Sequence, residues 1–288
     1  MLHSVSPVSA SLPIVAFPST HAHRLKSIDM LRGVAMLLMA LDHCSVAAHV
    51  NLTAESYDGV RPQLDSWPYV LTGLLTNLAS GIFFALTGVS VAFFETSRRK
   101  RGWSEWQITR FLFIRAGILL VLDQFVNRFG WYVGLMTFDV LSALAFALVV
   151  ISLARHLPLR VLALASLGLF LVYPLLVQWF PYNPAQPFSA IAAVLLQHQL
   201  ASAPAVEFPF LGRLALVLAG YVCGRLLQMG RITLVPRRLF QIALAGYAIW
   251  LVLRLLDGYG NFLPYQSGWP WYYFFIENKE PPSITFLL

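Results

Sequence analysis

The sequence has few charged residues and few cysteines, and each shortage excludes a class of protein. Only 11% of its 288 residues are charged, whereas 58% are hydrophobic, a balance typical of proteins that cross a membrane several times. The two cysteines, Cys44 and Cys223, both lie in apolar segments and give neither a disulfide framework nor zinc-ligand spacing. The sequence also lacks a phosphate loop, a dinucleotide-binding fingerprint and a cluster of metal ligands, so we expect no metal cofactor.

Basic residues outnumber acidic ones, but they do not form a nucleic-acid surface. The net charge of +7 is spread over joints between apolar segments, where it predicts membrane topology. The loops at 51–68 and 181–207 are acidic instead, with Arg61 as their single basic residue. By the positive-inside rule we expect a multi-pass protein of the cell (inner) membrane whose N-terminus faces the cytoplasm. The basic joints read TSRRKRGWSEWQITR, ARHLPLR and GRLLQMGRITLVPRR.

Apolar segments of about 20 residues predict an all-α, polytopic transmembrane bundle. We expect seven full helices and the start of an eighth in PPSITFLL, which has room for only about one and a half turns before the last residue. Residues 1–23 are predicted to be a flexible cytoplasmic tail, and 24–288 one membrane domain that is incomplete at its C-terminus. The seven segments are 30–50, 69–95, 108–127, 134–154, 160–180, 208–228 and 238–256.

The first apolar segment carries charges that a simple membrane anchor avoids. It reads SIDMLRGVAMLLMALDHC. On a helix, the steps from Arg32 to His43 return to within roughly 20° of one face, about 16 Å apart along the axis. Asp29 stands at ion-pair spacing from Arg32. Because charged side chains inside a bilayer usually face a cavity or a partner, we expect a polar site that includes Asp42 and His43. The alternative is a histidine hydrogen-bonded to a neighbouring helix.

The same segment resembles a known family. RLKSIDMLRGVAMLLMALDH is similar to the first helix of bacterial membrane proteins related to heparan-alpha-glucosaminide N-acetyltransferase, which reads Ser-hydrophobe-Asp, Leu-Arg-Gly and Leu-Asp-His. FFALTGVSVAFF and FIRAGILLVL resemble the second and third helices. FPFLGRLALVLAGYVCGRL resembles a segment that ends in Gly-Tyr-x-x-Gly-Arg, and NKEPPSITFLL resembles Lys-Tyr-Pro-Pro-Ser-Leu. The resemblance covers nearly all of residues 24–288.

Three departures from the family pattern bear on activity. The stretch DHCSVA lacks the basic residue that often follows the Asp-His pair, and Glu280 stands where the family usually has Tyr. The family continues with further helices after the Pro-Pro-Ser motif, and these are missing from this sequence. An inactive, truncated family member is therefore one alternative for the function.

The resemblance implies an acyltransferase that moves an acetyl group from acetyl-CoA to a hydroxyl or amine of a sugar-like acceptor across the membrane. Arg32 and Arg115 would bind the CoA phosphates, with Asp29 holding Arg32 in place. The predicted catalytic residues are His43 and Asp42, with His43 as general base or transient acetyl acceptor. Asp42 points about 100° away from His43, so we expect it to bond to another helix. The expected partners are the lipid bilayer, acetyl-CoA and the acceptor, and a homo-oligomer is left open.

Other polar and aromatic residues each allow two interpretations. Cys44 follows His43, but the same divergence argues against a nucleophile pair, and a buried cysteine is often a small apolar residue. The aromatic stretches 179–184 and 267–275 fit a membrane-interface belt better than a sugar-binding surface. Four further residues could line an acceptor pocket or form ion pairs between helices: Asp123, Arg128, Asp139 and Arg213.

The rival class of function is a transporter, in which Asp42, His43 and Asp123 would relay ions or protons. Transporters often contain internal repeats and broken helices, and neither is evident in this sequence. Acetyl-CoA binding separates the two hypotheses, because an acyltransferase requires it and a permease does not.

Overall fold

The computed structural model describes most of the chain in seven stretches. The predicted N-terminal tail lies outside the described residues. The stretches are 26–48, 55–64, 66–130, 136–186, 188–201, 203–233 and 235–288.

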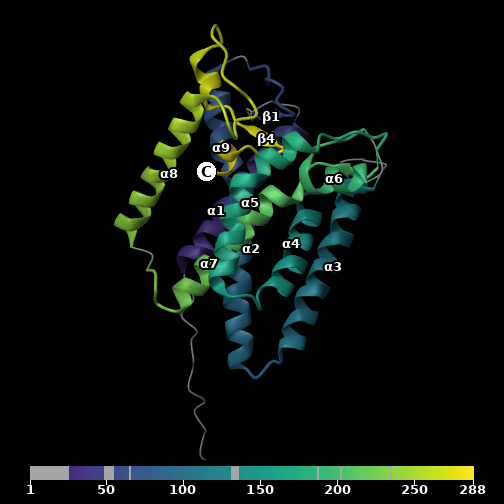
Figure 1. The fold of residues 1–288 in the computed structure, drawn as a ribbon, viewed down its shortest axis with the longest axis vertical. Helices are drawn as coiled ribbons and strands as arrows, with labels where there is room; N and C mark the ends of the chain where they lie inside the picture. The colour runs from purple at the N-terminus through teal and green to yellow at the C-terminus, as the bar shows by residue number, and fades with distance from the viewer. Residues whose placement is uncertain are drawn as a thin grey trace, which may run out of the picture.

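Long helices dominate these residues, as the apolar segments predict (Figure 1). Short helices α6 and α9, a 3₁₀ turn (η1) and four very short strands lie between or after them. The helices are α1 (Lys26–Ala47), α2 (Trp67–Lys100), α3 (Glu105–Phe129), α4 (Val140–Ala154), α5 (Leu159–Trp179), α6 (Ser189–Leu196), α7 (Phe210–Gln228), α8 (Pro236–Leu256) and α9 (Ile284–Leu287), with η1 at Trp271–Phe275.

Local chemistry sets where the helices begin and end. A capping box starts α3, because the Ser104 hydroxyl accepts from the Gln107 amide while the Gln107 side chain bonds the Ser104 amide. The Asp139 carboxylate caps α4, which moves the start of that helix from the predicted position 134 to Val140. At the other end of the bundle, α2 continues past the predicted 95, and its last turn holds the basic run that suits a helix C-terminus.

Among the described residues, α2, α5, α7 and α8 are long and apolar enough to cross a membrane, and α4 is a shorter apolar helix. Helices α1 and α3 have sufficient length, but several charged residues interrupt their apolar sequence. The chain is thus a mostly helical membrane protein with at least part of the predicted multi-pass arrangement. The count of seven spanning helices stays a prediction.

Helices α2 and α7 form the centre of the bundle through close backbone contact. A Cβ built on Gly88 would lie 2.5 Å from the Tyr221 amide nitrogen, and one built on Gly220 would lie 2.8 Å from the Ala85 carbonyl carbon. Only glycine permits such approach. The small residues of GVSVAFF and LAGYVCG therefore serve helix packing, as the sequence predicts. Buried Phe84, together with many apolar neighbours, completes this core.

Short strands depart from the purely α-helical prediction. Strand β1 (Ser56–Tyr57) pairs in parallel with β4 (Asn278–Glu280), and β2 (Thr137–Phe138) pairs in parallel with β3 (Ala205–Val206). They gather with α6 at one end of the bundle, opposite the turn between α2 and α3 (Figure 1). This end is therefore closed by loops and short ladders.

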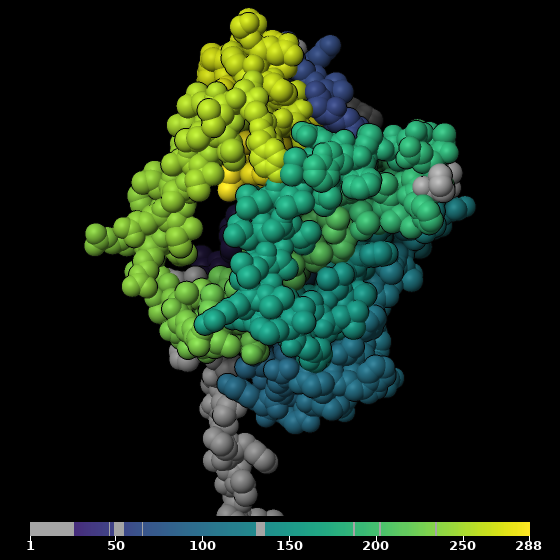
Figure 2. Space-filling model, in the orientation of Figure 1, coloured from purple at the N-terminus to yellow at the C-terminus, as the bar shows by residue number. Residues whose placement is uncertain are grey.

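Helix α8 stands apart from the other helices along most of its length, and Figure 2 shows an open gap between α8 and the bundle. Its buried side chains are Trp250 and Arg254, near its C-terminal end. There the Trp250 indole donates to Glu277 at 2.6 Å and stacks on Phe275 of η1. The aromatic stretch 267–275 thus packs α8 onto the end of the bundle that carries the strands.

Candidate functional site

One cavity of about 470 Å³ brings the predicted CoA-binding arginines together. It lies among α1 to α4, and Arg32 and Arg115 both line it with Ser90 and mainly apolar side chains. The Arg32 guanidinium bonds the Asp29 carboxylate at 3.2 Å and the Ser90 hydroxyl at 2.9 Å. This geometry confirms the i, i+3 ion pair. We call this space the arginine cavity.

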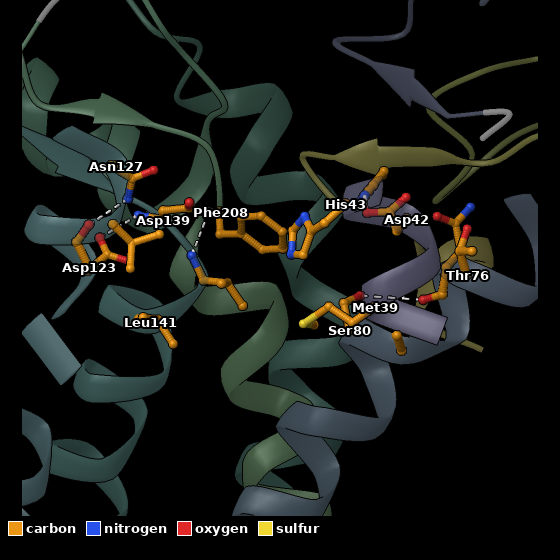
Figure 3. Close-up of a pocket in the computed structure, with 15 residues that line it drawn as sticks. Met39, Asp42, His43, Thr76, Ser80, Asp123, Asn127, Asp139, Leu141 and Phe208 are labelled. Atoms are coloured by element: carbon orange, nitrogen blue, oxygen red, sulfur yellow. Dashed lines mark hydrogen bonds and ion pairs between the residues drawn. The ribbon is translucent and has the colours of Figure 1, made fainter. Parts of the chain in front are cut away.

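The predicted catalytic residues lie in a second space. Two adjoining cavities of about 200 and 320 Å³ share Asp42, His43, Asn127, Asp139, Phe208 and Lys279, and we name them together the histidine cavity. Figure 3 shows the His43 ring opposite Phe208, between a wall from α1 and α2 and a wall from α3 and α4. His43 is exposed and lines this space.

The two cavities follow one another along the same helices. Helix α2 lines the histidine cavity between positions 76 and 80 and the arginine cavity between 83 and 94. On α3, Leu119 faces the arginine cavity, and Asp123, one turn later, faces the histidine cavity. Arg32 and His43 are therefore about 16 Å apart along α1 and line successive cavities.

The wall opposite His43 is acidic and internally hydrogen-bonded. Buried Asp123 accepts from the Ser142 hydroxyl at 2.7 Å and from the Asp139 amide at 3.2 Å. Burial raises the pKa of Asp139 to about 6, with the nearby carboxylates of Asp123 and Glu207 adding to the shift. Asp123 and Asp139 thus line the cavity, which is one of the two alternatives that the sequence leaves open for them.

The partner of Asp42 differs from the prediction. We expected Asp42 to bond to another helix, but its carboxylate faces Lys279 of strand β4, with 4.0 Å between Oδ2 and Nζ. The Lys279 ammonium also pairs with Glu55 at 2.5 Å, and the other Glu55 oxygen accepts from the Tyr57 hydroxyl at 2.7 Å. The prediction fails because it considered helices alone, whereas loops and strands close this end of the bundle.

Three other residues named from the sequence lie elsewhere in the structure: Arg213, Arg128 and Cys44. Arg213 does not line either cavity, because it forms a fully buried ion pair with Glu280 and lies 4.3 Å from the Phe208 ring. Arg128 is exposed on α3, and the exposed Cys44 is not among the residues that line the cavities. Arg213 therefore follows the ion-pair interpretation, and its partner is the very residue that departs from the family motif.

A cluster of His198 with two carboxylates lies next to the histidine cavity, which Tyr57 and Glu207 line. His198 contacts the carboxylates of Asp58 at 2.8 Å and Glu207 at 3.6 Å, and its ring lies 5.5 Å from the ring of Tyr57. Burial opposes its charge, but the hydrogen bond to Asp58 and the nearby carboxylate of Glu207 raise the pKa of His198 to about 10. The imidazolium thus ties the loop before α2 to the loop before α7.

The sequence profile of the heparan-alpha-glucosaminide N-acetyltransferase catalytic family matches residues 24–235, well over half of the chain. The chain belongs to this family. No curated protein and no solved structure matches it. Membership of the heparan-alpha-glucosaminide N-acetyltransferase family makes this a membrane protein of an acetyltransferase family, and most residues that line the cavities lie within the matched range.

The side chains that line the arginine cavity indicate which kind of ligand fits there. Two guanidinium groups line the arginine cavity, and its volume is in the range of small-molecule pockets. Within the described residues, no group of three or more His, Cys, Asp or Glu side chains is placed to hold a metal ion. The residues therefore suit a phosphate-bearing organic ligand.

Sequence analysis missed three charged residues of the histidine cavity, Glu55, Glu207 and Lys279. Lys279 belongs to the quoted NKEPPS motif, and it is the only lysine or arginine in that aromatic, C-terminal stretch after Arg254. Its separation from other basic residues was the signal that could have marked Lys279 as a site residue. Glu55 gives no such signal, because it is one of several acids in the loop at 51–68.

Proposed function

We propose that this protein is an acetyl-CoA-dependent membrane acyltransferase. The arginine cavity binds acetyl-CoA from the cytoplasmic side, and the histidine cavity receives a sugar-like acceptor from the other side. The observation that supports this function is the succession of cavities along the same helices, with guanidinium groups in one and an imidazole in the next. In this function a flexible thioester arm extends along the shared helices from Arg32 towards His43.

The orientation rests on charge. The basic run Arg98, Arg99, Lys100 and Arg101 lies at the turn between α2 and α3, at the opposite end of the bundle from the strands. The positive-inside rule assigns that end to the cytoplasm of a cell (inner) membrane protein. The acidic end with the histidine cavity then faces outward, where a surface sugar is available.

In this function His43 is the general base. The neutral imidazole takes a proton from the acceptor hydroxyl or amine as that group attacks the acetyl carbonyl carbon, and it returns the proton to the departing thiolate. Arg32 and Arg115 position the phosphates, and Asp29 and Ser90 orient the Arg32 guanidinium. Acidic Asp123 and Asp139 offer acceptors to the hydroxyl or ammonium groups of the sugar. An acetyl-histidine intermediate is the variant of this mechanism that the test distinguishes.

The test is transfer of radiolabel from acetyl-CoA in inverted vesicles that contain the full-length protein. His43→Ala should lower transfer by about 10²–10⁴-fold, while its neighbour Cys44→Ser, the matched control, should retain activity. Label trapped on wild-type protein would favour the acetyl-histidine route. Absence of both transfer and acetyl-CoA binding in the wild type would contradict the acyltransferase function and favour the transporter.

A further inference from the structure

We propose that Lys279 is a catalytic residue that stabilises the negative charge formed on the acyl carbonyl oxygen during transfer. This inference rests on the acyltransferase function. Its basis is the charge of the histidine cavity, where Asp42, Glu55, Asp139 and other acids line the walls. Lys279 is the only lysine or arginine among the described lining residues. A developing oxyanion beside His43 would meet repulsion from every other ionised group there.

Strand β4 holds Lys279 at this position. Ser56 and Tyr57 of β1 pair with Asn278 and Glu280, and the Ser56 hydroxyl bonds the Asn278 side chain at 3.0 Å. On the other side, the buried Arg213 guanidinium contacts the carbonyl oxygen of Lys279 at 3.5 Å. The residues on both sides of Lys279 are thus fixed, so its ammonium has a defined place in the cavity wall.

The Lys279 ammonium remains charged and keeps hydrogen-bonding capacity. Burial opposes the charge, but the carboxylates of Glu55 and Asp42 raise its pKa above the ordinary value. An ammonium has three N–H donors. One donor serves Glu55 at 2.5 Å, whereas Asp42 at 4.0 Å is beyond hydrogen-bond distance. The other donors are available to a group in the cavity.

The reaction balances with these groups. The acceptor O–H or N–H bond breaks as His43 takes the proton, a bond forms between the acceptor and the acyl carbon, and the carbonyl π electrons move to oxygen. Lys279 faces that oxyanion. When the C=O bond re-forms, the C–S bond breaks, and the thiolate takes the proton from His43. Lys279 remains protonated throughout, and no further reactant is needed.

A purely structural role for Lys279, joining α1 to β1 and β4, is the competing interpretation. Lys279→Met alone leaves Asp42 and Glu55 without their cation, so it can disturb folding. The double variant Lys279→Met/Glu55→Gln removes the ammonium together with its hydrogen-bonded carboxylate, so that only Asp42, at 4.0 Å, loses its cation. Glu55→Gln alone keeps the ammonium but removes a carboxylate that raises its pKa.

The experiment measures kcat and KM for acetyl transfer, acetyl-CoA affinity and thermal unfolding for the full-length wild type and these variants. We expect the double variant to fold, to bind acetyl-CoA like the wild type and to lose about 10²–10³-fold in kcat, the usual effect of removing one oxyanion donor. Glu55→Gln should lose less, and the alkaline limb of its pH profile should move to lower pH. Lys279→Arg should recover part of kcat.

The outcomes separate this inference from the proposed function. If the wild type transfers acetyl groups and the folded double variant has the same kcat, Lys279 is not catalytic but the acyltransferase function stands. If Glu55→Gln reproduces the full loss without a shifted pH profile, the network is structural and the inference is overturned. A wild type that transfers nothing overturns both.

Discussion

The contact between α2 and α7 gives the most direct test of the fold through Gly220→Ala. A Cβ at this position lies 2.8 Å from the carbonyl carbon and 3.1 Å from the Cα of Ala85. Carbon atoms in contact sit about 3.5–4.0 Å apart, so the helices must separate by at least about 0.7 Å. Both atoms belong to backbone, and a side-chain rotation cannot relieve the overlap.

The destabilisation expected from Gly220→Ala follows from the dense packing of the core. Overpacking of this kind costs about 1–3 kcal/mol. Gly168→Ala in α5 is the matched control, because a Cβ there meets no atom within 4 Å. In that helix, alanine gains up to about 1 kcal/mol over glycine. Because Gly220 also lies in a helix, this gain applies to both variants, and they should differ in their free energy of unfolding by the overpacking cost of about 1–3 kcal/mol.

Unfolding in mixed micelles with increasing SDS, followed by tryptophan fluorescence, measures that difference. Gly220→Ala should unfold at lower SDS than the wild type, and Gly168→Ala at equal or higher SDS. Equal stability of the two variants would refute the close approach of α2 and α7. Because α2 lines both cavities, Gly220→Ala should also lower acetyl transfer, whereas Gly168→Ala should not.

Three further predictions concern the charged groups. Arg32→Gln should weaken acetyl-CoA binding about tenfold or more, because a charge-assisted hydrogen bond contributes about 1.5–3 kcal/mol, which isothermal titration can measure. Glu280→Gln should destabilise the protein by about 3–5 kcal/mol by leaving buried Arg213 unpaired, and Glu280→Met/Arg213→Met should recover most of it in thermal unfolding. The raised pKa of His198 predicts stabilisation that is complete below about pH 6.5 and lost as pH rises through about 10; His198→Gln should remove this part of the pH dependence of thermal unfolding.

Local patterns in the sequence predict the helices well, and for a physical reason. Hydrophobic length places α5 and α7 within two residues of the predicted segments, and small residues in GVSVAFF and LAGYVCG mark the α2–α7 contact. The strand pairs were missed because they depend on distant partners. Ser56 and Asn278 are 222 positions apart, and two-residue strands carry no periodicity that a sequence pattern can detect.

At the site, too, contacts between residues close in the sequence are predictable, whereas contacts between distant residues are not. Asp29 and Arg32 are three residues apart on one helix, so helical spacing alone predicts their ion pair. The pair between Lys279 and Glu55 joins residues 224 positions apart. A single sequence does not show that two residues so far apart along the chain lie side by side. Lys279 could therefore be noticed only as an isolated cation.

In the proposed function, the helices and the loops would carry different parts of the activity. The arginine cavity is built by helices, whereas β1, the residue before it and β4 supply Tyr57, Glu55 and Lys279 to the histidine cavity. Loops and short strands tolerate sequence change better than the helices that support them. Substitutions such as Tyr57→Phe should therefore alter the KM for the acceptor, while acetyl-CoA affinity, set by Arg32 and Arg115, stays the same. The donor would be fixed by the bundle and the acceptor by the loops that close it.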